Sequence, residues 1–225
     1  MDEGVAKATP CRVRPCRLRR TPNSMSGAWF DGYSITRCCL SRIELCADAL
    51  ILRQLTMLSF GFPPVSSPTA RVLVLGSLPG RLSLERGEYY ANPQNAFWKI
   101  VAARIMDLPS GYPGRVAAVV ERGVALWDVL AAATRSGSLD ADIGADAMPN
   151  NFRAFFHIHP HIRLLAFNGA TAAKLYERHV IPTLTDGQCA IPCVTLPSTS
   201  AAHASLPIAT KVARWSVLLG DQSLG

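Results

Sequence analysis

The sequence predicts an α/β fold of three layers, in which helices cover both faces of a central, mostly parallel four-stranded sheet. Short apolar runs bounded by turn residues have the length of buried strands, and they occupy residues 72–75, 124–127, 164–167 and 193–196. Helical periodicity separates these runs, near residues 95–106, 114–122, 151–158 and 170–179, with a last helix near 206–219. Such alternation requires crossover connections, which produce a parallel sheet covered on both faces.

Several of the expected helices begin at side chains that can accept hydrogen bonds from first-turn amides. Asn95 precedes the first helix, Asn150 and Asn151 precede the third, and Asn168 with Gly169 precedes the fourth. These residues support the positions of the helix starts.

The first 56 residues differ from the rest of the chain. Residues 1–56 contain nine Lys and Arg against five Asp and Glu, and they show no sustained pattern before about residue 43. Met57 stands directly before the patterned part. We therefore expect a poorly patterned basic extension over 1–56 and a globular domain over 57–225. A mis-assigned start codon near Met57 and a loosely ordered basic arm would both explain the extension.

Composition excludes several classes of protein. With 49% hydrophobic and 17% charged residues, the chain is globular rather than disordered. No apolar run reaches the roughly 18–20 residues that span a bilayer, so we expect no membrane segment. Five of the seven cysteines lie in 1–56 without a signal peptide, which favours a reduced intracellular protein. The net charge of +7 divides into +4 and +3 between the two parts, so charge alone supports a nucleic-acid partner only weakly.

We expect no metal site and no cofactor. Structural metal sites need ligands at short paired spacings, and the early cysteines have no histidine nearby. His157, His159 and His161 form an alternating run, but Pro160 interrupts it. This run is therefore interpreted as a solvated loop between a helix and a strand.

A glycine–proline loop follows the first expected strand. It consists of Gly76, Ser77, Leu78, Pro79 and Gly80, and its spacing lacks the fingerprint of a phosphate-binding loop. We interpret it as a tight strand-to-helix turn whose glycines let the backbone approach a ligand closely. Because ligands of parallel sheets bind beyond the carboxyl ends of the strands, the loop marks a candidate pocket.

Residues 89–98 are dense in aromatic and amide side chains. Tyr89 and Tyr90 are either core and rim aromatics or a platform for a flat ring, where stacking on a base contributes roughly 1–3 kcal/mol. Asn95 is either a helix cap above the buried pair Phe97 and Trp98, or a group that orients a water or holds a base edge. An amide suits the second role because it both donates and accepts.

Polar residues also follow two other strands. Asp128 stands at the end of the second strand, where it is either an acid or base or the cap of a following helix. Ser198, Thr199, Ser200 and His203 follow the last strand. Their hydroxyl groups either bind phosphates or form a turn that caps the final helix.

Taken in chain order, these segments resemble one family. The matching motifs are residues 76–80, 89–98, 126–130 with 137–140, 167–169, and 196–200. Over about residues 59–220 the chain resembles the uracil-DNA glycosylase superfamily, and within it the DNA-deoxyinosine glycosylases, which remove hypoxanthine. The mismatch-specific uracil glycosylases, which share the segment around Asn95, are the near relatives.

Two leucines depart from the pattern of the superfamily. Most branches carry an Asp or Asn that handles the attacking water at the place of Leu78, and a His or Asn that faces the base at the place of Leu196. The hypoxanthine-removing branch resembles this chain in lacking the first of these groups. The resemblance therefore implies that Asn95 is the principal polar residue of the site and argues against a strictly uracil-specific enzyme.

The resemblance implies a monofunctional glycosylase that hydrolyses the N-glycosidic bond of a deaminated base extruded from DNA. Hypoxanthine is the first expected substrate, with uracil and xanthine as further ones. Asn95 would be catalytic and hold the water. The base would contact Ser77, Leu78, Tyr90 and Asn168, and the DNA would contact Gly80, Ser198, Thr199, Ser200 and His203.

The expected partner is DNA that contains deaminated bases, bound by a monomer without cofactor or metal. The expected location is the cytoplasm, at the nucleoid in a bacterium. Three alternatives stay open: a mismatch-specific uracil-DNA glycosylase, a non-catalytic reader of damaged DNA, and a binder of small nucleotides on a flavodoxin-like sheet. The last is the weakest, because the phosphate fingerprint is missing.

Overall fold

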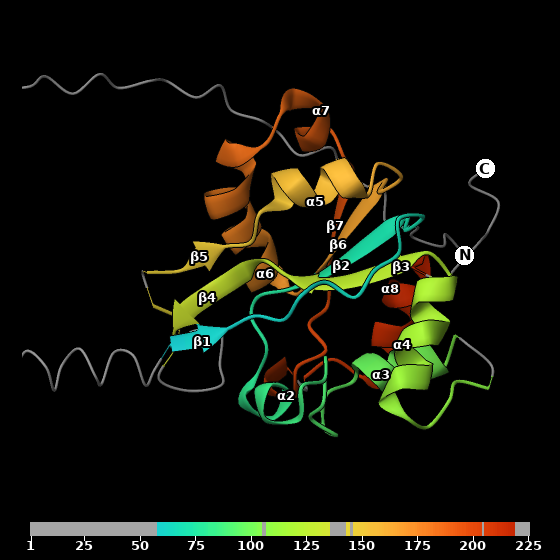
Figure 1. Cartoon of the computed structure of the whole chain (residues 1–225). Coiled ribbons are helices and arrows are strands. Elements are labelled where there is room, and N and C mark those ends of the chain that lie inside the picture. The colour runs from blue at the N-terminus through green and yellow to red at the C-terminus, as the bar shows by residue number, and fades with distance from the viewer. Residues whose placement is uncertain (1–57, 105–106, 136–142, 145, 204, 219–225) are drawn as a thin grey trace, which may run out of the picture. The chain divides into compact units, whose positions relative to one another are not determined.

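The computed structural model describes residues 58–104, 107–135, 143–144, 146–203 and 205–218 (Figure 1). The extension over 1–56 and residues 137–140 of the third motif lie outside these ranges. Across the described ranges, no helix is long and apolar enough to cross a bilayer.

Four parallel strands form the central sheet, as the sequence predicts. They are β2 (Val72–Gly76), β3 (Val124–Asp128), β6 (Leu164–Asn168) and β7 (Cys193–Leu196), and they lie in the order β3-β2-β6-β7. The two central strands are β2 and β6, whose inner residues are buried on both faces, as near-continuous apolar runs require. All four carboxyl ends therefore lie at one edge of the sheet.

Helices connect the strands, and five of them overlap the ranges predicted to be helical, whereas those at 81–86 and 186–189 fall outside these ranges. They are α2 (Arg81–Arg86), α3 (Phe97–Ala102), α4 (Tyr112–Glu121), α5 (Phe152–Ile158), α6 (Ala170–Leu175), α7 (Asp186–Cys189) and α8 (Ile208–Trp215). A π-helical turn continues α6, and short 3₁₀ turns cover Ile181–Thr183, Ala201–His203 and Ser216–Leu218. Asn151 caps α5 as predicted, because its side chain accepts a hydrogen bond from the Ala154 amide at 3.0 Å.

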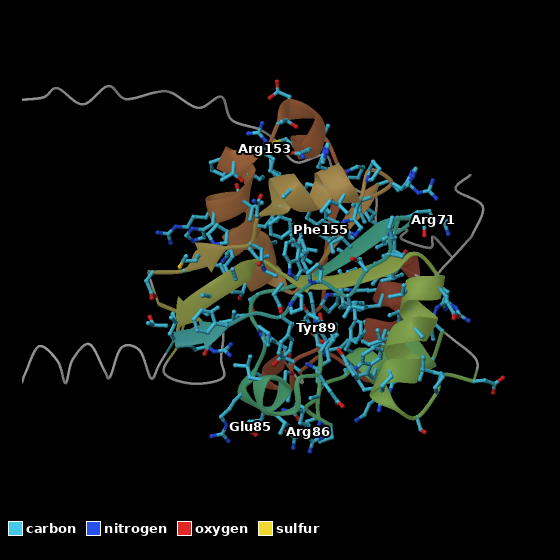
Figure 2. All side chains as sticks on the ribbon, viewed as in Figure 1. Arg71, Glu85, Arg86, Tyr89, Arg153 and Phe155 are labelled. Atoms are coloured by element: carbon cyan, nitrogen blue, oxygen red, sulfur yellow. The ribbon has the colours of Figure 1, made fainter. Side chains whose placement is uncertain are left out.

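The helices form one layer on each face of the sheet (Figure 1). Alternate residues of a strand point to opposite faces. Leu73 and Leu75 of β2 therefore pack with the aromatic residues of α5, whereas Val74 packs with those of α3 and α8. Figure 2 shows Phe155 in the layer of α5 and Tyr89 on the opposite side of the sheet. The predicted three-layer arrangement is confirmed.

A second, antiparallel sheet was not predicted. It contains β1 (Leu58–Phe60), β4 (Leu130–Thr134) and β5 (Met148–Pro149), in the order β1-β4-β5. Its strands are short, and the Ala-rich sequence of β4 carries little of the β-branched signal typical of a strand. Because β4 begins two residues after Asp128, a strand and not a helix follows Asp128, and the interpretation of this residue as a helix cap is wrong.

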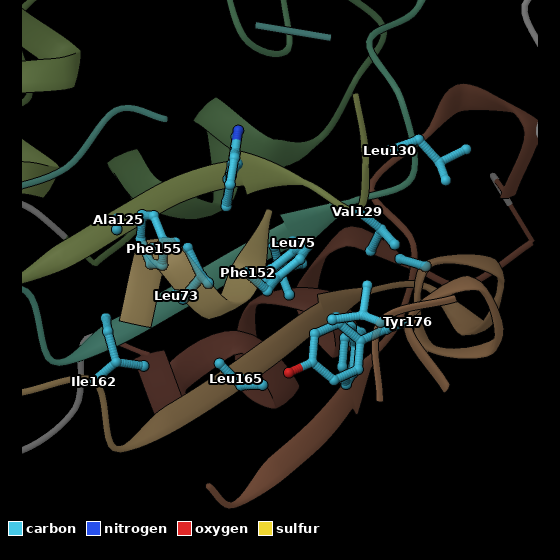
Figure 3. Close-up of a cluster of buried hydrophobic side chains, with 14 of the residues drawn as sticks. Leu73, Leu75, Ala125, Val129, Leu130, Phe152, Phe155, Ile162, Leu165 and Tyr176 are labelled. Atoms are coloured by element: carbon cyan, nitrogen blue, oxygen red, sulfur yellow. The ribbon is translucent and has the colours of Figure 1, made fainter. Parts of the chain in front are cut away.

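The layer under α5 is a cluster of buried hydrophobic side chains that includes several aromatic rings (Figure 3). Phe152 is fully buried there, and its ring centroid lies 4.9 Å from that of Trp127 and 5.2 Å from that of Tyr176. These contacts connect α5 to β3 and to the π-helical turn, so this side chain links three elements.

Replacing Phe152 by Ala should lower the free energy of unfolding by about 3–5 kcal/mol, because a fully buried ring leaves a cavity. The matched control is Ile158→Ala on the same helix, where the side chain is 61% exposed; its effect should stay within about 0.5 kcal/mol. Urea unfolding followed by circular dichroism measures both. Equal effects of the two variants would contradict the assigned core.

Candidate functional site at the strand ends

A cavity of about 700 Å³ opens at the carboxyl ends of the parallel strands. Ligands of such sheets bind at this edge. Its lining comes from the loop after β2, from α2, the segment before α3, the ends of β3 and β6, the start of α6, and the loop after β7. The residues are Gly76, Ser77, Leu78, Pro79, Gly80, Arg81, Leu82, Ser83, Glu85, Tyr89, Tyr90, Asn92, Asn95, Asp128, Asn168, Thr171, Ser198, Ser200, Ala201, Ala202 and His203.

The predicted site residues thus gather at one pocket, with one exception. Nine of the ten residues expected to act on base or DNA line the cavity, whereas Thr199 does not. Thr199 belongs to the loop after β7, but it is only 1% exposed and its side chain is buried. Leu196 is also buried and packs in the apolar layer with Val74, so it presents no group to a ligand.

The loop after β2 runs as the tight turn that the sequence predicts, and it enters α2 at Gly80. Gly76 has no room for a side chain, because a Cβ there would overlap Oδ1 of Asp128. The main chain then pairs with the start of β4, since the Val129 and Leu130 amides donate to the Gly76 and Ser77 carbonyls at 2.9 and 3.1 Å. This contact lets the loop and the Asp128 carboxyl share the floor of the pocket.

Arg135 supports the same loop from behind and was missed by the sequence analysis. It is 6% exposed, and its Nη2 donates to the Pro79 carbonyl. Nothing in its sequence neighbourhood distinguishes it from a surface arginine. Leu78, 6% exposed, packs into the core and lines the cavity with an apolar side chain.

Two tyrosines stand near the Asp128 carboxyl. Burial, and secondarily the Asp128 charge, raise the pKa of both Tyr89 and Tyr90 above the ordinary value. For Tyr90, a hydrogen bond with the Asn168 side chain partly opposes this rise in pKa. Both phenols are therefore neutral at physiological pH, and the Tyr89 hydroxyl donates to the Pro63 carbonyl at 3.3 Å.

Tyr90 holds its ring in one orientation. Its φ of 57° is in the left-handed region, which is uncommon for an aromatic residue and marks a position held by its surroundings. The ring stacks on Phe97 with centroids 4.0 Å apart and an interplanar angle of 24°. Since Phe97 is 1% exposed, it provides a rigid support for a ring that lines the pocket.

Asn95 combines parts of both sequence interpretations. Its Oδ1 accepts the Phe97 amide at 2.9 Å, which orders the turn before α3, although the cap position itself belongs to Ala96. The residue is half-buried and lines the pocket. A carbonyl oxygen accepts two hydrogen bonds, so Oδ1 retains a second acceptor position.

A paired amide contact joins the ends of β6 and β7. Asn168 donates through Nδ2 to Oγ1 of Thr199 at 2.8 Å, and its Oδ1 accepts the Thr199 amide at 2.8 Å. The Thr199 carbonyl accepts the Ala96 amide, also at 2.8 Å. Thr199 therefore connects the loop after β7 to the strand that ends at Asn168 and to the turn that contains Asn95.

The loop over 197–203 is internally bonded. The Ser200 amide donates to Oγ of Ser198 at 3.2 Å, and the Ala202 amide donates to Oγ of Ser200 at 3.4 Å. These bonds form turns that lead into the 3₁₀ turn Ala201–His203, whereas α8 begins after Pro207. The hydroxyl turns therefore order the loop itself and do not cap the final helix.

The final helix anchors that loop through two side chains that the sequence analysis missed. Nζ of Lys211 donates to the Ser198 carbonyl at 2.7 Å and to the His203 carbonyl at 2.9 Å. Nε1 of Trp215 donates to the Pro197 carbonyl at 2.9 Å. Lys211 is 4% exposed, and burial lowers the pKa of its ammonium. The available signal was its place on the apolar stripe of α8.

The alternating histidines lie away from the pocket. His159 is buried rather than solvated: its ring stacks on Phe155 at 4.0 Å, and its Nδ1 lies 2.9 Å from the Phe155 carbonyl oxygen. Packing of the ring on Phe155 accounts for its burial. Among the residues that the structure describes, no group of three or more His, Cys, Asp or Glu could hold a metal ion.

Fold and site define an α/β protein with a pocket beyond the strand ends, lined by a stacked tyrosine, amides and hydroxyls. The sequence matches the family model "Uracil DNA glycosylase superfamily" over residues 63–218. The chain belongs to this superfamily. Its class is therefore that of the DNA glycosylases, hydrolases that cleave the bond between a base and its sugar.

Two relatives and one solved structure are similar to this chain. A hypoxanthine DNA glycosylase of Methanosarcina acetivorans is 34% identical over 137 residues, 56% of this chain and 86% of the relative. One of Methanosarcina barkeri is 39% identical over 119 residues, 52% of this chain and 74% of the relative. The solution NMR structure of a candidate uracil DNA glycosylase from Methanosarcina acetivorans is 33% identical, with a TM-score of 0.60, and covers 72% of this chain and 98% of that one.

Replacing Gly76 by Ala should reduce the rate of base release by about 10²-fold, because the methyl group displaces the Asp128 carboxyl from the pocket floor. The free energy of unfolding should fall by about 1–3 kcal/mol. In the control Gly187→Ala, a Cβ meets nothing within 4 Å, so activity should not change. Single-turnover base release and urea unfolding measure both variants. Wild-type release by Gly76→Ala would contradict this geometry.

Proposed function

We propose that this protein removes hypoxanthine from DNA by hydrolysing the N-glycosidic bond of an extruded deoxyinosine. The observation that carries the proposal is that the pocket is lined by both an amide side chain, Asn95, and an apolar one, Leu78. Asn95 lines it as a polar side chain, while Leu78 stands where most branches of the superfamily carry Asp or Asn. The names of the two Methanosarcina relatives support the same substrate.

Extrusion of the base precedes the chemistry. Unstacking and unpairing cost a few kcal/mol, and they cost least for a mismatched base. A mismatched deaminated base is therefore extruded more easily than a paired base, before any contact with the pocket. Stacking on Tyr90 returns roughly 1–3 kcal/mol. Since Phe97 covers one face of that ring at 4.0 Å, the opposite face is the one that receives the base.

The Asp128 carboxyl would distinguish hypoxanthine from adenine and uracil from cytosine. Hypoxanthine, uracil and xanthine each carry a ring N–H beside a carbonyl, where adenine and cytosine carry a ring nitrogen lone pair beside an amino group. A carboxyl oxygen accepts a hydrogen bond from that N–H, but it finds no donor at a ring nitrogen lone pair. Backbone amides near Ser77 and Leu78 would donate to the neighbouring carbonyl, and both residues line the pocket, as does Asn168.

Bond cleavage runs ahead of the attack of water. The free acceptor position on Oδ1 of Asn95 holds the water, but an amide does not titrate near neutrality and is no general base. The C1′–N bond therefore lengthens first, giving an oxocarbenium-like sugar and an anionic base. Each donor aimed at that base stabilises the transition state by roughly 2.7–4 kcal/mol. Water then adds to C1′ and loses a proton to solvent, while the anionic base takes up a proton from solvent. The products are the free base and an abasic sugar.

The loop over 197–203 contacts the DNA backbone. The hydroxyl oxygens of Ser198 and Ser200 already accept loop amides, so their O–H groups can donate to phosphate oxygens. Gly80 and His203 lie on the rim of the same pocket. Thr199, which is 1% exposed, orients the loop through Asn168 rather than contacting a phosphate itself.

The product is an intact abasic strand. Strand cleavage by a glycosylase needs an amine at the sugar, and no lysine lines the cavity among the described residues. Lys211 gives two of its N–H groups to loop carbonyls. The activity is therefore monofunctional.

A non-catalytic reader of damaged DNA is the second candidate, and one observation favours it. Oδ1 of Asn95 already accepts the Phe97 amide, which weakens its hold on a water. A reader binds inosine-containing duplex tightly and leaves it unchanged after prolonged incubation.

Replacing Asn95 by Ala should lower hypoxanthine release from deoxyinosine duplex by at least about 10²-fold, because the water loses its position. Binding of the duplex should change by less than about threefold, a small free-energy difference. The control is Gln94→Ala, an exposed amide one residue away that does not line the pocket. Chromatography of the released base and fluorescence anisotropy measure the two quantities. Undiminished release by Asn95→Ala would overturn the catalytic assignment, and tight binding without release by the wild type would favour the reader.

A further inference from the structure

One buried cation holds both ends of the loop that follows β7. Nζ of Lys211 donates to the carbonyl oxygens of Ser198 and His203, at 2.7 and 2.9 Å. These two residues enclose the segment that carries the hydroxyls and the imidazole at the pocket rim. The ammonium therefore links the two ends of the segment 198–203 through their carbonyl oxygens. Side chains of this segment line the pocket.

The cost of this arrangement shows that Lys211 is not an ordinary helix residue. A buried ammonium loses its hydration, and burial is usually offset by a carboxylate partner. In the described part of the chain, the salt bridge is between Arg81 and Glu85, which are both exposed, and does not involve Lys211. Lys211 has two backbone carbonyls in place of a carboxylate, and hydrogen bonds from a charged donor are stronger than those between neutral groups.

Packing of α8 does not require the charge. Trp215, on the same helix, is 1% exposed, and its ring lies 5.8 Å from that of Phe97 in the apolar layer. This contact docks the helix on the sheet. A methionine at position 211 would fill nearly the same volume without the desolvation cost. The role of the ammonium is therefore to be found in its hydrogen bonds to the loop.

We propose that Lys211 is a positioning residue for DNA binding, which sets the spacing between Ser198 and His203 so that the loop meets the strand beside the extruded nucleotide. The proposal rests on the proposed function, because it assigns the loop to DNA. Its site of action is the loop backbone, and Lys211 touches neither the base nor the reacting bond. The loss of Lys211 therefore affects binding of DNA more than the hydrolytic step.

The test compares Lys211→Met with Lys174→Met in the full chain. The second variant removes the same charge from an exposed position on α6. Lys211→Met should raise KM for deoxyinosine duplex by about tenfold, the effect of losing one well-placed hydrogen bond to a charged group. Its kcat should change by less than about threefold. Hydrogen exchange should become faster over 197–203 and stay unchanged in the central strands, and Lys174→Met should show none of these effects.

An unchanged KM in a folded Lys211→Met protein would overturn the proposal, as would a fall in kcat alone with loop protection intact. If Lys211→Met does not fold, Lys211→Arg keeps a donating cation, and KM should stay within about threefold of the wild type; a tenfold rise in the folded Arg variant would overturn the proposal. Failure of the proposed function is separate: the wild type would then release no hypoxanthine, while hydrogen exchange would still test the loop.

Discussion

The site depends on the paired hydrogen bonds between the Asn168 amide and Thr199. A parallel sheet brings four strand ends to one edge, but it does not by itself set the loops that leave them. The two bonds of 2.8 Å tie the loop after β7 to β6, and the Thr199 carbonyl ties it to the turn before α3. Because both ends of the Asn168 amide are used, its rotation is fixed, and the three segments keep one relative placement.

Other parts of the pocket are held in the same way, by bonds to loop carbonyls. Arg135 donates to the Pro79 carbonyl, and Trp215 donates to the Pro197 carbonyl. Lys211 donates to the carbonyls at both ends of the segment 198–203. Buried polar donors of this kind are costly unless every partner is present, so they specify one loop conformation. The resulting pocket needs little rearrangement around the stacked pair Tyr90 and Phe97, which suits a base that must be held while its bond to the sugar breaks.

The sequence predicted the central sheet because each strand is a short apolar run between turn signals, and it predicted the site because polar residues follow those runs. It missed β4 because an Ala-rich segment has weak strand preference, and with β4 it missed the true neighbour of Asp128. It missed Lys211 and Arg135 because a charged residue normally lies at the surface. Thr199 was expected to contact a phosphate. Only the three-dimensional contact with Asn168 shows that its side chain is buried.

The central claim is that this pocket excises a deaminated base, and alkali-labile sites in a panel of duplexes measure it most directly. The panel carries deoxyinosine, deoxyuridine or deoxyxanthosine at one position, beside an undamaged control. The account predicts abasic sites at deoxyinosine above all, none in the control, and no strand cleavage before alkali treatment. Excision from none of the damaged duplexes would contradict it.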